Sequence, residues 1–207
     1  MDATVAGRAR AALRDLERVE GGIIARRDSL DKEGRSAQRR LLDVARALLD
    51  TAILQARDGR TTLGALQREY PGAALLREYE AQRLLADGEP LRALGLFDGL
   101  LRAQRRNVPL LRGRARALDA LRREPDATDA WQRLLDGYPT DVEAFEALWH
   151  RHQRASTMGE LHKTVMRLRL LHPADTVLLG REVRVLQQMG LADSAVAVVR
   201  RFTGGGA

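Results

Sequence analysis

The chain has 207 residues, of which 35 are Lys or Arg and 28 are Asp or Glu, so its formal net charge is +7. Hydrophobic residues make up 44% of the chain, enough to bury the core of one or two domains, and the low aromatic content of 4% favours close-packed helices over a β-sandwich. The absence of cysteine excludes disulfides, thiolate metal sites and a cysteine nucleophile.

The positive charge consists almost entirely of arginine, since Lys32 and Lys163 are the two lysines. The arginines are interspersed with acidic residues and do not form blocks. This pattern is typical of solvated helix faces on which opposite charges pair one turn apart. The distribution favours a compositional origin of the charge over a selected nucleic-acid surface.

Residues 4–20 are predicted to form an extra N-terminal amphipathic helix, and a charged connector follows it to residue 35. Ser36 is the expected N-cap of the next helix, Asp58-Gly59 breaks that helix, and a shorter one runs to Tyr70. The N-terminus lacks the continuous apolar stretch of a signal peptide, and no window is long enough to cross a membrane. We therefore expect a cytoplasmic protein without membrane insertion, with a periplasmic location as the alternative if a signal peptide has been removed.

From residue 73 onward the helices are predicted to come in pairs joined by short turns. The expected pairs are 73–87 with 90–104, 108–122 with 127–137, 141–155 with 158–171, and 175–189 with 191–202. Proline near the start of a helix and glycine just past its end support these boundaries. The glycine-rich tail, residues 204–207, is expected to be disordered.

Apolar residues in the second helix of each pair recur at intervals of 34 residues. The first column is Ala93, Ala127, Leu161 and Ala195; four residues later come Phe97, Trp131, Val165 and Val199; three further on come Leu100, Leu134, Leu168 and Phe202. A fixed period of this length is typical of stacked helix-turn-helix repeats. The sequence therefore predicts an all-α solenoid over residues 36–203.

The repeated segment resembles the tetratricopeptide repeat family. The resemblance is strongest from Gly88 to Phe97, which is similar to the family's turn and second helix, and Gly190 stands at the same turn position three periods later. Proline closes three repeats, at Pro71, Pro139 and Pro173. The pattern departs from the family where Arg122 and Ser156 replace the turn glycine and Arg105 replaces a proline. It also departs where Trp149 stands at a position for a small residue and Asp43 and Asp50 fall on packing positions. The resemblance implies about five repeats in a right-handed solenoid that serves as a non-enzymatic scaffold or adaptor for other proteins.

The sequence contains no motif of an enzyme or a cofactor site. A nucleophile elbow, a phosphate-binding loop and a zinc-binding helix motif are all missing. The four histidines fall between residues 150 and 172, but they occupy different repeat positions and do not predict a shared metal site. We therefore predict no catalytic residues, no cofactor and no metal.

The first helices of the pairs, here called A helices, are expected to line the concave side of the solenoid, and the second helices, called B helices, to cover its outside. The residues predicted to face the groove are Glu78, Gln82, Arg112, Arg116, Asp119, Glu146, His150, Gln153, Arg181, Arg184 and Gln187. Arginine pairs with carboxylates through two parallel hydrogen bonds, so this groove predicts binding of an acidic or carboxylate-bearing protein segment. The family's lysine and asparagine clamp for a C-terminal carboxylate is missing from these positions.

A second candidate surface is the C-terminal end of the array, where residues 195–199 are apolar on every side of a helix. Val196, Val198 and Phe202 are therefore predicted to form an interface with a second copy or with another subunit of a larger bacterial assembly. Two other functions remain open, a nucleic-acid-binding helical repeat and the regulatory subunit of an enzyme complex. The few aromatic residues disfavour nucleic acid because they leave little for base stacking.

Overall fold

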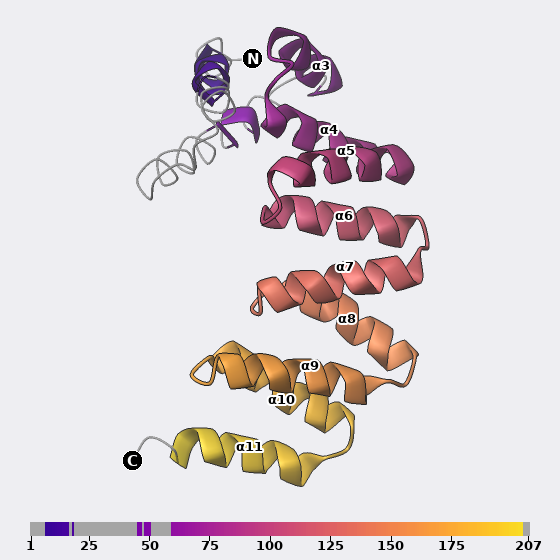
Figure 1. Cartoon of the computed structure of the whole chain (residues 1–207), viewed down its shortest axis with the longest axis vertical. Coiled ribbons are helices and arrows are strands. Elements are labelled where there is room, and N and C mark those ends of the chain that lie inside the picture. Colours follow the sequence, from indigo (N-terminus) through magenta and orange to yellow (C-terminus); the bar gives the residue numbers. More distant parts are fainter. Residues whose placement is uncertain (1–6, 17, 19–44, 47, 51–58, 205–207) are drawn as a thin grey trace. The chain divides into compact units, whose positions relative to one another are not determined.

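The structure, a computed structural model, describes residues 7–16, 18, 45–46, 48–50 and 59–204. The chain divides into two compact units, Met1–Gln104 and Arg105–Ala207. Every regular element in these described ranges is a helix, and no strand occurs among them (Figure 1). The predicted all-α helical-repeat fold is confirmed.

The N-terminal unit contains a helical segment at residues 7–16, followed later by α3 (Gly59–Glu69), α4 (Ala74–Ala86) and α5 (Pro90–Ala103). The predicted N-terminal helix is confirmed over 7–16, while the connector and the Ser36 cap lie outside the described residues. The apolar side chains of the first segment pack into a common core with α3 and α4. This core is formed by Ala12, Leu13, Leu16, Ala45, Leu49, Leu63, Leu66, Tyr70, Ala73, Leu75 and Leu76.

The C-terminal unit contains three antiparallel helix pairs (Figure 1). The A helices are α6 (Val108–Ala120), α8 (Val142–Arg154) and α10 (Thr176–Gln188), and the B helices are α7 (Glu124–Gly137), α9 (Met158–Leu171) and α11 (Ala192–Gly204). The predicted boundaries of these helices agree with the structure to within two residues except at α7, which begins at Glu124 and not at residue 127. Pro125 lies in its first turn, where a missing N–H leaves no helical hydrogen bond unmade.

In all four pairs, the second residue after the end of the A helix has a left-handed backbone conformation. Its φ is +81° at Gly88, +56° at Arg122, +55° at Ser156 and +75° at Gly190. The amide of the residue that follows donates back into the last turn in each case, as Thr157 does to the carbonyl of His152 at 2.8 Å. The repeat thus keeps the turn geometry even where glycine has been replaced.

The predicted apolar columns of the B helices form the core of the first three pairs, whereas Val199 and Phe202 of the last pair are not buried. Ala93, Phe97, Leu100, Trp131, Leu134, Val165 and Leu168 are all buried. The indole N–H of Trp131 donates to the carboxylate of Asp119 at 2.7 Å, so the largest side chain of the column also has its polar atom paired. The 34-residue period therefore reports real interior positions.

Candidate functional site

The predicted groove residues lie on the A helices of both units. Glu78 and Gln82 belong to α4 in the N-terminal unit, and the other nine belong to α6, α8 and α10 in the C-terminal unit. In the C-terminal unit, ion pairs and hydrogen bonds connect successive A helices. We call the surface that carries these nine residues the A-helix face.

Two arginines of α6 are paired with acidic residues at the start of α8. Arg112 donates to the buried carboxylate of Asp141 at 2.6 and 2.9 Å. Arg116 binds the carboxylate of Glu143 through two hydrogen bonds, of 2.5 and 2.7 Å, and this pairing raises the pKa of Arg116. A third connection joins Asp119 to Arg151 near the other end of these helices. The charges of Arg112 and Arg116 are therefore neutralised within the unit.

The arginines of α10 are also engaged. Arg184 pairs with Glu146 of α8 through both oxygens, and its guanidinium carbon lies 4.1 Å from the ring centroid of Trp149. Arg181 is buried and donates to the main-chain oxygens of Pro139, Thr140 and Asp141. Its role in the fold is to satisfy three carbonyls ahead of α8, and burial lowers its pKa.

The remaining predicted groove residues divide into one buried residue and a set of exposed polar ones. Glu78 is buried, and Arg46 holds its carboxylate through hydrogen bonds of 2.7 and 2.8 Å. The exposed members are Gln82, His150, Gln153 and Gln187. Sequence spacing placed all eleven residues on the A helices correctly, but it gave no sign that most of the charged ones are paired inside the chain.

The C-terminal end is the second predicted surface. Val196 is exposed, and Val198 and Phe202 are half-buried. The clearest sign of an uncovered helix is Val199, which is 39% exposed although its column partners Val165 and Trp131 are 0% and 2% exposed. The reason is that α7 packs between α6 and α8 and α9 packs between α8 and α10, whereas α11 packs against α10.

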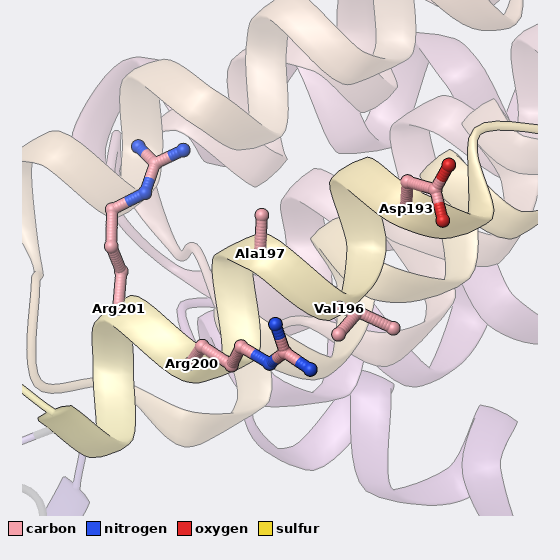
Figure 2. Close-up of a pocket in the computed structure, with 5 residues that line it drawn as sticks. All are labelled: Asp193, Val196, Ala197, Arg200 and Arg201. Carbon is pink, nitrogen blue, oxygen red and sulfur yellow. The ribbon is translucent and has the colours of Figure 1, made fainter.

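The free surface of α11 also carries charge. An open depression there is lined by Asp193, Val196, Ala197, Arg200 and Arg201. Figure 2 shows Val196 and Arg200 together on one side of the helix, while Arg201 leaves it on the side of Ala197. Neither arginine has an acidic partner among the residues that the structure describes. This end of the unit is thus both apolar and basic.

Sequence reasoning missed a groove between α9 and α11, which has α10 at its base and a volume of about 530 Å³. Its apolar walls are Met166 and Leu170 of α9 and Ala197 and Val198 of α11, together with Pro173, Leu186 and Leu191. Met166 and Leu170 are exposed and lie one turn apart, a spacing that the sequence contains but that repeat columns of core positions do not report.

The polar residues at this groove are His162, Arg169 and Glu182, with Ser194 and Arg201 beside them. Arg169 donates to the buried carboxylate of Glu182 at 2.5 Å, and His162 Nε2 lies 3.7 Å from the same carboxylate. No group of three or more potential metal ligands occurs in the described part of the chain. Within the same ranges, no helix is both long and apolar enough to span a bilayer.

No protein-family model matches the chain, and no curated protein matches its sequence. Among solved structures, the crystal structure of MamA is similar over 86% of this chain and 95% of that one, with 12% sequence identity and a TM-score of 0.44. So distant a likeness supports no statement about function, and the fold described above rests on the helices of this chain.

Proposed function

We propose that this chain is a non-enzymatic interaction module whose C-terminal unit binds another protein at the uncovered end of α11. The observation that supports this is the exposure of Val199, at a column position that is buried in α7 and α9. A partner that covers this face would remove Val196 and Val199 from water, which favours association. The tetratricopeptide-like arrangement of the helices agrees with a scaffold in a larger bacterial assembly.

The A-helix face is the second surface that we propose for a partner segment, and there the partner would have to exchange with carboxylates of the chain itself. Arg116 and Arg184 are exposed, and their pairs with Glu143 and Glu146 lie at the surface, where ion pairs contribute little to stability. A carboxylate of the partner would replace Glu143 or Glu146, while His150, Gln153 and Gln187 supply hydrogen bonds. Because the partner's carboxylate must displace Glu143 or Glu146, we propose that the A-helix face binds more weakly than the uncovered end of α11.

The same pairing argues against nucleic acid as the partner of the A-helix face. A protein that binds phosphates needs arginines whose charge is not already compensated. In the C-terminal unit, Arg112, Arg116, Arg151, Arg167 and Arg184 each hold a carboxylate. We therefore favour a protein partner over nucleic acid. A scaffold of this kind could also be the regulatory subunit of an enzyme complex, which we retain as the alternative function.

Photo-crosslinking in the native cell tests the proposal. A photoreactive amino acid replaces Val196 at the end of α11, or, as the control, Val142 of α8, which is also an exposed valine. We expect a specific crosslinked protein from position 196, mapped by mass spectrometry, and its loss when Val199→Glu is added. A crosslinking pattern that is the same from both positions, or that survives Val199→Glu, would contradict binding at this end. Light scattering of the purified chain separates a second copy from a different partner.

A further inference from the structure

The groove between α9 and α11 has a counterpart one repeat earlier, between α7 and α9. There Asp136 of α7 accepts a hydrogen bond from Gln132 at 3.0 Å and an ion pair from Arg167 of α9. These three polar side chains connect the two B helices. The corresponding surface between α7 and α9 therefore carries a network formed by the chain's own side chains.

The residues one period later keep the arginine and lose its partners. Arg201 stands at the position of Arg167, but Leu170 replaces Asp136 and Met166 replaces Gln132. Arg201 has no acidic partner among the described residues, and Leu170 is 78% exposed. An exposed leucine at a position where the preceding repeat carries an aspartate raises the free energy of the isolated chain, because it leaves apolar area in water and an arginine uncompensated.

We propose that this outer groove binds an amphipathic helix of a partner protein, with an apolar stripe against Met166, Leu170 and Val198 and a carboxylate paired with Arg201. Charge complementarity selects the acidic partner: the missing carboxylate is the one that Asp136 supplies to Arg167 in the preceding repeat. Geometry selects a helix, because the groove walls are helices whose main-chain groups are already bonded and cannot pair with an extended strand.

The groove differs from the end of α11 in the residues that it offers. Val196 and Val199 do not line it, whereas Met166 and Leu170 of α9 do. The groove is therefore a second binding surface with its own partner chemistry. The inference rests on the proposed function, because both require the chain to be a protein-binding module. Ala197 and Arg201 line both surfaces, so the changes that separate them are those at Val199 for the end and at Met166 and Leu170 for the groove.

The test uses the full chain and a fluorescein-labelled helical peptide with leucines at i, i+4 and i+7 and glutamates on the other faces. A second peptide has lysine in place of every glutamate. We expect the acidic peptide to bind, and the lysine peptide to bind at least about tenfold more weakly, measured by fluorescence anisotropy. Equal affinities for the two peptides, or no binding of the acidic one, would overturn the proposal.

The decisive variant copies the preceding repeat into the groove by combining Met166→Gln with Leu170→Asp. It provides Arg201 with an internal partner, so we expect the affinity for the acidic peptide to fall at least about tenfold while the melting temperature stays the same or rises. The matched control is Leu171→Asp, because Leu171 is also an exposed leucine, at 67% against 78% for Leu170, but does not line the groove. Unchanged binding by the double variant would sink the assignment.

Two arginine variants measure the electrostatic contribution to the binding of the acidic peptide. Arg201→Gln should weaken binding of the acidic peptide and reduce its advantage over the lysine peptide, whereas Arg133→Gln, at the same column position in α7, should do neither. If the purified chain dimerises and the double variant abolishes the dimer, the occupant is a second copy and the proposed partner is wrong. If a protein still crosslinks at position 196 but the peptide fails to bind, the proposal for the groove is wrong and the proposed function at the end of α11 is retained.

Discussion

Arg181, on α10, donates a hydrogen bond of 2.7 Å to the main-chain oxygen of Asp141, which lies 40 residues earlier and caps α8. The side chain of the same Asp141 accepts the amide of Ala144 at 2.8 Å and the guanidinium of Arg112. One residue therefore connects three A helices, and Arg181 covers the carbonyls around it. Its guanidinium also lies 4.6 Å from the ring centroid of Phe145.

Replacing Arg181 should destabilise the C-terminal unit. Arg181→Ala removes a buried guanidinium that donates to three carbonyls, and of these the carbonyl of Asp141 keeps the amide of Phe145 as a donor. We expect a loss of about 2–3 kcal/mol in the free energy of unfolding, measured by urea denaturation. Arg184→Ala is the control, because Arg184 is exposed and its pair with Glu146 is solvated; we expect a loss of less than about 1 kcal/mol. Equal losses for both variants would show that Arg181 has no special structural role.

Trp131 should be the most costly apolar residue to remove. It is 2% exposed, and its indole N–H donates to Asp119, so Trp131→Ala creates a cavity and removes one of the donors to that carboxylate, which keeps its pair with Arg151. We expect a loss of about 3–5 kcal/mol. In a stacked array each repeat is held mainly by its neighbours, so amide exchange should speed up in α6 and α8 as well as in α7. Faster exchange in α7 alone would argue against such coupling.

The left-handed turns offer a stabilising change. Ser156 has a φ of +55°, which costs about 1–2 kcal/mol for a residue with a Cβ, whereas glycine adopts it without strain. Because glycine also loses more chain entropy on folding, we expect Ser156→Gly to gain a net of about 0.5–1 kcal/mol, seen as a higher melting temperature.

The reverse change provides the control for the turn. Gly88 has a φ of +81°, and a Cβ added there would meet no atom within 4 Å, so any effect of Gly88→Ala comes from the backbone alone. We expect that variant to be destabilised by about 1 kcal/mol. A neutral Gly88→Ala together with a neutral Ser156→Gly would mean that the turn imposes no strain.

His152 should make the C-terminal unit less stable in mild acid. Burial lowers the pKa of His152 below its usual value of 6.5, and its ring Nδ1 lies 2.9 Å from the hydroxyl of Thr157. The unfolded chain then binds the proton more readily than the folded one, so stability is full above about pH 6.5 and falls as the pH drops towards the lower folded pKa. His152→Gln should reduce this dependence, measured as unfolding free energy against pH. An unchanged slope would assign the effect to other groups.

The 34-residue columns predicted the helix pairs and the interior positions because they record apolar burial, which a sequence displays as a period. The start of α7 was placed three residues late, since Glu124-Pro125-Asp126 was read as a turn although proline is compatible with the first turn of a helix. The left-handed conformation of Arg122 could not be predicted from its residue type, because the repeat, and not the side chain, imposes it.

The candidate surfaces were less predictable than the fold. Spacing identified the A-helix face, but Arg181 and Arg184 look alike in sequence, and one is buried over carbonyls while the other is exposed on Trp149. Which acidic residue each arginine meets depends on contacts between helices about 30 to 40 residues apart. The groove at Leu170 becomes visible only when its partner across the groove, Arg201, is known.

The position of Asp141 also limits how this chain can change in evolution. Helical arrays commonly gain or lose whole repeats, because each unit makes similar contacts with the next. Here Arg112 and Arg181 approach Asp141 from the A helices on either side, and neither arginine has an equivalent one period away: the positions 34 residues after Arg112 and before Arg181 are Glu146 and Ala147. Deleting or duplicating the central pair, α8 and α9, would separate these residues or leave one set of carbonyls without the arginine that donates to them. The three C-terminal pairs are therefore expected to be inherited as a block of fixed length.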